Sequence, residues 1–478
     1  MDKYESPFSS RYASDYMLEL FSANTRYRIW RELWISLAKA ESKLGLPITE
    51  EQIKDLEEHK EPIDYELVKA REKEVRHDVM AHVYAYGKAA PSAAGIIHLG
   101  ATSCYVTDNA DLVIYRDALE YIRKELLEVI SNLADFSLQY KDVPTLGYTH
   151  YQPAQPVTVG KRATLWIQDL VSDLAEVDFA LSNIRFLGSR GTTGTEASFM
   201  DLFEGDTAKI DEMNRMIAGD FGFKDIFPVS GQTYPRKTDV RILNCLSSIA
   251  QSLYRMANDI RLLAHDRQLE EPFEKNQIGS SAMAYKRNPM RCERICSLSR
   301  YLMTNAMNGV MTASSQWLER TLDDSANRRI AIPEAFLACD GILNLYCNVV
   351  KGIRFFPAIM KKHLQEELPF LATENILMFC VKEKQGDRQL LHEKIRIHAL
   401  QAAEEIKLNG KENDLLDRIA GDPAFALSAE ELGAITDPKQ FTGVAELQCE
   451  HYLDQVIHPL LTMNRTETEN KPEDPIIV

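Results

Sequence analysis

The segment from Gln277 to Pro289 contains the residues best suited to chemistry in this sequence. One glycine and two serines make it rich in hydroxyl groups, and Lys286 adds a cation. Asn288 followed by Pro289 predicts an N-cap and a first helical residue, which would place Lys286 beside a helix N-terminus. Backbone N–H groups, the helix dipole and a lysine would together favour an anion there. An exposed polar loop in front of a well-capped helix fits the composition equally well.

A second loop, residues 146–156, contains His150 between aromatic residues and two prolines that stiffen the backbone. A histidine held in place can act as an acid or a base, because its pKa is near neutrality. A lone histidine is more often structural, and by itself this loop would not decide between the two.

A third region begins with Arg76, His77 and Asp78 and continues with the segment 98–103, which includes Thr102 and Ser103. Arginine, histidine and hydroxyl side chains in short order suit contacts with carboxylate or phosphate.

The spacing of His77 and His82, five residues apart, does not place both on one helical face, so it argues against a zinc site. The sequence has no P-loop and no G-x-G-x-x-G motif after a strand. Nucleoside triphosphates and dinucleotide cofactors therefore have no support.

Near residue 320 lies a further basic and hydroxyl cluster, consisting of Arg320, Ser325, Arg328 and Arg329. Arginines near a serine can bind a phosphate. The alternative is a solvated helix surface whose arginines pair with the neighbouring aspartates 323 and 324.

Helices must position these loops, because apolar residues recur at spacings of three and four along most of the chain. The pattern covers residues 30–44, 119–133, 170–184 and 242–263, and a further helix is expected from Pro289 towards Val310. The middle helices should reach about 25–30 residues, far above the mean of about 11–12 for compact domains. They predict an elongated bundle with apolar stripes wide enough for packing between subunits.

The fold class is therefore all-α, with minor β-structure and three helical regions. The first is residues 1–105, with shorter helices, and the second is residues 106–355, the long-helix bundle. The third is residues 356–478, where helices shorten again between prolines and glycines.

Composition excludes several classes of function. The 478 residues have 55 Lys and Arg against 71 Asp and Glu, a net charge of −16, which argues against general nucleic-acid binding. The sequence contains no run of about 18 uninterrupted apolar residues, so it predicts no membrane span. Its polar start lacks the apolar core of a signal peptide, so it predicts no secretion signal. We expect a cytoplasmic protein without a membrane partner, whose eight scattered cysteines are free thiols.

Taken together, the motifs resemble the fumarase/aspartase superfamily, whose signature G-S-S-x-M-P-x-K-x-N-P matches Gly279 to Pro289. Ala284 departs from it, standing where the family usually has proline. Within the superfamily the chain is most similar to the adenylosuccinate lyase family over nearly its whole length. The matching segments are 10–12, 76–78, 102–103, 149–155, 231–234, 286–289 and 324–329.

This resemblance implies an all-α homotetramer with a central bundle completed by tetramerisation, in which each active site takes residues from three subunits. It implies a C–N lyase that eliminates fumarate from adenylosuccinate, leaving AMP, and from the succinyl-carboxamide ribotide SAICAR, leaving AICAR. Ser280 would be the general base and His150 the general acid.

The resemblance also assigns binding roles. His77 would support the phosphate or the acid step, while Lys286 would stabilise the developing charge. Succinyl carboxylates would contact Thr102, Ser103, Lys286 and Asn288. The substrate-binding residues implied by the family are Arg11, Tyr12, Arg76, His77, Asp78, Thr102, Ser103, Gln232, Lys286, Asn288, Arg294, Arg320, Ser325 and Arg329. No metal and no organic cofactor is implied.

Two alternatives remain open at this stage. One is a different elimination within the superfamily, acting on argininosuccinate, malate or aspartate. An enzyme of that kind should lack the arginines and serine that bind a phosphate. The other is an inactive helical structural protein descended from such an enzyme, against which the intact Ser280, His150 and Lys286 argue.

Overall fold

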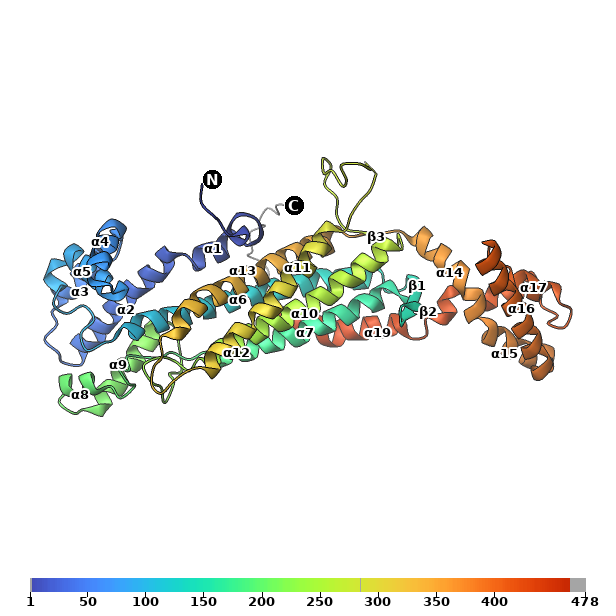
Figure 1. Cartoon of the computed structure of the whole chain (residues 1–478). Coiled ribbons are helices and arrows are strands. Elements are labelled where there is room, and N and C mark those ends of the chain that lie inside the picture. Colours follow the sequence, from blue (N-terminus) through green and yellow to red (C-terminus); the bar gives the residue numbers. More distant parts are fainter. Residues whose placement is uncertain (1, 284, 465–478) are drawn as a thin grey trace.

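The computed structural model describes residues 2–283 and 285–464, which form an elongated, mostly helical molecule (Figure 1). The β-structure among these residues consists of two two-stranded antiparallel sheets and one isolated bridge. The all-α prediction is confirmed. Ala284, the residue that departs from the family signature, lies outside the described residues.

In the N-terminal region, η1 and α1 lie along the bundle, and α2 leads from there to the short helices α3, α4 and α5 at one end of the molecule (Figure 1). Ser14, Ser22 and Thr49 cap α1, α2 and α3 with their hydroxyls, as N-cap residues do. The elements are η1 (Phe8–Tyr12), α1 (Asp15–Leu20), α2 (Ala23–Lys43), α3 (Glu50–Glu58), α4 (Tyr65–Val75), α5 (Asp78–Ala89) and η2 (Pro91–Ala93).

Long helices form the central bundle and alternate in direction along it (Figure 1). Because α6, α10 and α13 begin at the same end, the loops before them meet there, while the loops after them meet at the other end. The bundle elements are α6 (Ser103–Gln139), β1 (Pro144–Thr149), β2 (Gln152–Thr158), α7 (Val159–Asn183), α8 (Ala197–Leu202), α9 (Thr207–Asp220), α10 (Lys237–His265), β3 (Leu269–Glu270), α11 (Met290–Asn305), α12 (Met307–Ser314), α13 (Asp323–Gly352) and β4 (Arg354–Phe355).

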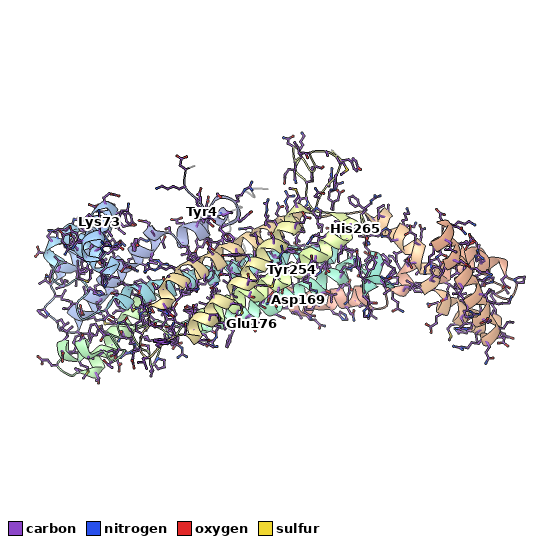
Figure 2. All side chains as sticks on the ribbon, viewed as in Figure 1. Tyr4, Lys73, Asp169, Glu176, Tyr254 and His265 are labelled. Atoms are coloured by element: carbon purple, nitrogen blue, oxygen red, sulfur yellow. The ribbon has the colours of Figure 1, made fainter. Side chains whose placement is uncertain are left out.

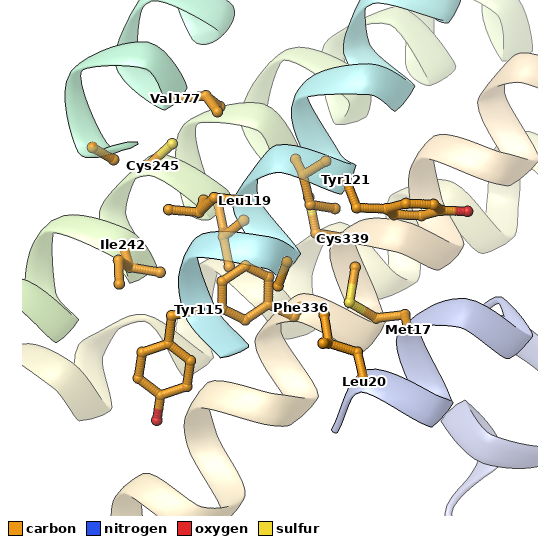
Figure 3. Close-up of a cluster of buried hydrophobic side chains, with 14 of the residues drawn as sticks. Met17, Leu20, Tyr115, Leu119, Tyr121, Val177, Ile242, Cys245, Phe336 and Cys339 are labelled. Carbon is orange, nitrogen blue, oxygen red and sulfur yellow. The ribbon is translucent and has the colours of Figure 1, made fainter. Parts of the chain in front are cut away.

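The bundle core is continuous and apolar. Figure 3 shows Leu119 of α6, Val177 of α7, Ile242 of α10 and Phe336 of α13 converging on one buried cluster. Burying such side chains stabilises the fold by about 1.5–3 kcal/mol each relative to leaving them in water. Helix α13 is long and apolar enough to cross a membrane by composition, but 78% of that stretch is buried inside the bundle.

The C-terminal region has a second, separate core between residues 372 and 435. After it the chain turns back, and Cys449, Leu453 and Ile457 pack into the core of the bundle. The division at residues 105 and 355 stays a prediction. The elements are α14 (Pro357–Leu371), α15 (Thr373–Lys384), α16 (Arg388–Asn409), α17 (Leu415–Gly421), α18 (Ala429–Ile435), η3 (Pro438–Phe441), α19 (Ala445–Tyr452), η4 (Leu453–Ile457) and α20 (His458–Met463).

The structure corrects the helix expected from Pro289 towards Val310. It begins at Met290, and a break at Ala306 separates α11 from α12. Beside the break, the Asn308 side-chain amide donates to the Asn305 carbonyl at 3.1 Å, which takes up a backbone acceptor. The prediction of free cysteines is confirmed, since all eight are free and buried.

Candidate active site

His77 and Ser103, far apart in the sequence, meet at the end of the bundle where α6 begins. His77 is the N-cap of α5, and its Nδ1 accepts a hydrogen bond from the Met80 amide at 3.3 Å. Its Nε2 lies 3.4 Å from the Ser103 hydroxyl. Arg76, immediately before, holds a left-handed backbone (φ 54°) that separates α4 from α5. The turn therefore presents Arg76, His77 and Asp78 together.

Gln232 lies at the same end, in the loop before α10. Its side-chain amide donates to the Thr192 carbonyl at 3.1 Å, and its carbonyl oxygen lies 3.5 Å from the Cys104 thiol. The backbone here approaches the next loop closely, because a Cβ on Gly231 would lie 2.4 Å from the Glu319 carbonyl oxygen. Only glycine permits that approach without a shift of the chain.

The arginine cluster around residue 320 contains both exposed and buried side chains. Arg329 is exposed and lies 3.4 Å from the Asp78 carboxylate, so α13 meets the start of α5. Arg320 is partly exposed and pairs with buried Asp324 at 2.8 Å. Arg328 is buried and pairs with Asp239 at 2.7 Å, which makes it a structural residue. Ser325 lies between these groups in the first turn of α13.

His150 lies at the opposite end of the bundle, on the exposed turn of the β1–β2 hairpin. His150 and Tyr151 are the two central residues of this turn and both have positive φ, 53° and 57°. Such a turn normally uses Asn, Asp or Gly, because most other residues are strained at positive φ. Strain of this kind, held where a histidine projects into solvent, is typical of functional sites.

The loop between β3 and α11 stands off the same end of the bundle (Figure 1). Its Ser280 hydroxyl accepts hydrogen bonds from the backbone amides of Ala282 and Met283, at 3.3 and 3.1 Å. Two N–H donors aimed at one oxygen favour its negatively charged form. Lys286 is exposed in the same loop.

Asn288 does not cap the helix, and that prediction is wrong. Its amide instead donates to the Gly279 carbonyl at 2.9 Å and ties the two arms of the loop together. The buried Glu271 carboxylate takes the capping role, accepting from the amides of Arg291 and Cys292 at 2.8 and 3.1 Å. Two amides at the helix N-terminus therefore already donate to a side chain of the same protein.

A third group of predicted site residues, Arg11, Tyr12 and Arg294, lies along the bundle. Tyr12 packs against α13, where a Cβ on Gly341 would approach the Tyr12 carbonyl at 2.8 Å. The Arg294 guanidinium lies over the Tyr12 ring, 5.5 Å from its centre, as a cation–π pair. Arg11 is exposed beside them.

The predicted site residues thus occupy separate places in one chain. Helix α10 connects the Gln232 loop to the Ser280 loop, and its 29 residues span about 42 Å at 1.5 Å per residue. In Figure 2, Lys73 marks the end near His77 and His265 marks the end below the Ser280 loop. Within the described residues, no hydrogen bond or ion pair joins Ser280 or His150 to the opposite group.

Comparisons with known proteins identify the family to which these motifs belong. A lyase family model matches residues 8–303, and a model described as the adenylosuccinate lyase C-terminus matches residues 369–452. An adenylosuccinate lyase of Schizosaccharomyces pombe is 51% identical over 96% of this chain and 95% of its own. The chain belongs to the adenylosuccinate lyase family.

Other relatives of this family agree over the same length. An adenylosuccinate lyase of Saccharomyces cerevisiae is 50% identical over 96% of each chain. Solved structures share the fold at lower identity. The 3-carboxy-cis,cis-muconate lactonizing enzyme of Pseudomonas putida has a TM-score of 0.81 at 21% identity, covering 95% of this chain and 99% of its own. A fumarate lyase of Mesorhizobium has a TM-score of 0.79 at 23% identity, with the same coverage.

Sequence reasoning missed several residues that shape these places. Glu271 lies about twenty residues from the helix end that it caps, and nothing local in the sequence marks it. The buried ion pairs of Arg236 with Asp108 and Asp324 were also missed, because burial and long-range pairing are not visible in a motif.

Proposed function

We propose that the protein is an adenylosuccinate lyase that eliminates fumarate from adenylosuccinate, leaving AMP, and from SAICAR, leaving AICAR. One structural observation carries the choice of substrate. Arg320, Ser325 and Arg329 are gathered at the end of the bundle that also holds His77 and Ser103. A phosphate-bearing substrate needs such a cluster of arginines and a hydroxyl, whereas malate or aspartate does not. The printed names of the half-identical relatives support the same choice.

In the proposed reaction, the Ser280 alkoxide takes the proton from the succinyl carbon beside a carboxylate. The electron pair left on that carbon is delocalised into the carboxylate and then forms the double bond of fumarate as the C–N bond breaks. The amides of Ala282 and Met283 would stabilise the alkoxide before the proton is taken. Lys286 would stabilise the negative charge that builds on the substrate.

His150, protonated at the start, gives its proton to the leaving nitrogen. The hairpin supports this role, since it holds the imidazole in solvent on a strained two-residue turn. Thr102, Ser103 and Asn288 would hold the succinyl carboxylates.

We also propose a homotetramer in which three subunits complete each site. The support is the distance of about 42 Å along α10 between the two groups, which one chain cannot close by moving a loop. Antiparallel association of bundles would place the end with Ser280 and His150 of one copy near the end with His77 of another. We place the protein in the cytoplasm, where both reactions would have their substrates.

A direct assay tests the activity. Purified protein is incubated with adenylosuccinate, SAICAR, argininosuccinate, malate or aspartate, and the products are measured. We expect turnover of the first two alone. No turnover of adenylosuccinate, with turnover of another compound, would replace the proposal by a different elimination. If the protein turns over none of the five compounds, a structural role is favoured.

Mixing inactive variants tests the shared site. Ser280→Ala and His77→Ala tetramers are each expected to be inactive, but dissociation and reassembly of a mixture should restore part of the activity. Sites then form that take Ser280 from one subunit and His77 from another. Mixed tetramers that stay inactive would contradict a site shared in this way.

A further inference from the structure

We propose that Arg236, bridging Asp108 and Asp324, is a positioning residue that fixes Arg320 for binding the substrate's phosphate. This inference rests on the proposed function. Arg236 Nε donates to Asp324 at 2.6 Å, and Nη1 donates to Asp108 at 2.9 Å. The second oxygen of Asp324 accepts from Arg320 at 2.8 Å. A single chain of charges therefore runs Asp108–Arg236–Asp324–Arg320.

Each buried member of the chain belongs to a different segment of the proposed site. Asp108 lies in the first turns of α6, a few residues after Ser103. Arg236 follows Gln232 at the start of α10. Asp324 lies in the first turn of α13, beside Ser325. Arg236 thus ties together the three segments that carry the predicted binding residues of this end.

The bridge is built for rigidity. The side chains of Arg236, Asp108 and Asp324 are 2%, 3% and 0% exposed. A planar guanidinium group can donate to two carboxylates at once, as Arg236 does. The Arg236 guanidinium also lies over the Tyr234 ring, 4.5 Å from its centre. Burial raises the pKa of Asp324, but Arg236 and Arg320 outweigh it and the net pKa is lowered, so the carboxylate stays charged. Removing either partner would leave an uncompensated buried charge.

Arg320 is the exposed end of this chain, with 22% of its side chain in solvent. Its hydrogen bonds among the described residues run through Nη1, to the Thr321 carbonyl and to Asp324. Nε and Nη2 remain to face an anion. Because Asp324 holds the guanidinium in place beforehand, less side-chain entropy is lost when phosphate binds.

Asp324→Asn is the sharpest test, since it removes the charge and keeps the shape. Inhibition constants are measured for AMP and for adenosine, which lacks the phosphate. We expect AMP to bind about tenfold more weakly, a loss of about 1.4 kcal/mol. Adenosine should be affected by less than twofold.

A double-mutant cycle ties this effect to Arg320. In an Arg320→Ala background, Asp324→Asn should weaken AMP binding no further, since Arg320, the residue that Asp324 positions, is gone. Arg236→Lys provides a second variant, because lysine keeps the charge but cannot bridge two carboxylates with a planar fork. It should also weaken AMP selectively.

Arg31→Gln is the matched control. Arg31 is equally buried, 1% exposed, but donates only to backbone carbonyls of residues 59–62. It should lower the thermal midpoint without changing the ratio of AMP to adenosine affinity. Equal weakening of AMP and adenosine by Asp324→Asn, or an undiminished effect in the Arg320→Ala background, would overturn the inference. Wild-type turnover of adenylosuccinate would in that case leave the proposed function standing.

Discussion

The two ends of the bundle hold their predicted site residues by different means. At the end where α6, α10 and α13 begin, buried ion pairs fix the segments, and the bridging side chains of Asp108, Arg236 and Asp324 are almost inaccessible. At the other end, His150 and Ser280 sit on a hairpin and a loop that project from the bundle, held by local hydrogen bonds and a strained turn.

Under the proposed function, this difference assigns substrate binding mainly to the first end and the reacting groups to the second. A phosphate is best recognised by cations that are fixed before it arrives, which requires buried counter-charges. Under the proposed function, a base and an acid would reach a substrate held by another copy of the chain, and elements that project from the bundle would allow this. Stability should therefore depend on the first end, and turnover on the second.

The largest effect should come from Ser280→Ala. Loss of the base should lower kcat by about 10³-fold or more, while the thermal midpoint and the oligomeric state stay those of the wild type. Rate measurements at saturating adenylosuccinate test this, with Ser281→Ala, the exposed neighbouring serine, as the control. A Ser280→Ala variant that keeps its rate would remove the serine from the chemistry.

His150→Asn should lower kcat by about 10²-fold or more, because the proton donor is lost. Asn adopts positive φ more readily than most residues, so the hairpin should be unchanged or slightly more stable. Tyr151→Asn is the matched control, sharing the turn geometry without the acid. Equal loss of rate in both variants would assign the effect to turn shape.

Glu271→Ala tests whether the base of the Ser280 loop has its own anchor. Loss of the cap on α11 should cost about 1–2 kcal/mol and lower the thermal midpoint. Glu270→Ala, which breaks only the partly exposed pair with Arg287, should lower it by less than half as much. A midpoint insensitive to Glu271→Ala would show that the helix end is held by something else.

A further prediction concerns the acid stability of the end of the bundle where α6 begins. Burial lowers the pKa of His82 and of His98 to about 4 in the folded protein, against about 6.5 in an unfolded chain. The unfolded state therefore binds protons first, and stability falls as pH drops from about 6.5 to 4. The slope is about 1.4 kcal/mol per pH unit for each histidine.

His82→Phe should reduce this slope, since the ring packs between Tyr27 and Trp30 and phenylalanine can fill the same space without titrating. Thermal midpoints measured between pH 7 and 4.5 check it. Parallel curves for the variant and the wild type would show that His82 does not report on acid unfolding.

Much of the fold could be predicted from the sequence, because helical periodicity is a local signal. Residues 119–133 and 242–263 lie within single long helices, and 170–184 lies within another except for Ile184, its C-cap residue. The break at Ala306 and the cap by Glu271 were not predicted. The cap depends on a contact between residues about twenty positions apart, which no short window contains.

The sequence by itself determined the family and predicted a set of reactive side chains, because the signature loop and the half-identity to relatives are properties of residue order. Only the tertiary structure decided where those side chains lie. Alternating helix direction places the loops that carry the predicted site residues at opposite ends of the bundle, separated by about 42 Å along α10. It also decided which arginine is buried, since the pairing of Arg328 with Asp239 depends on how α10 and α13 pack.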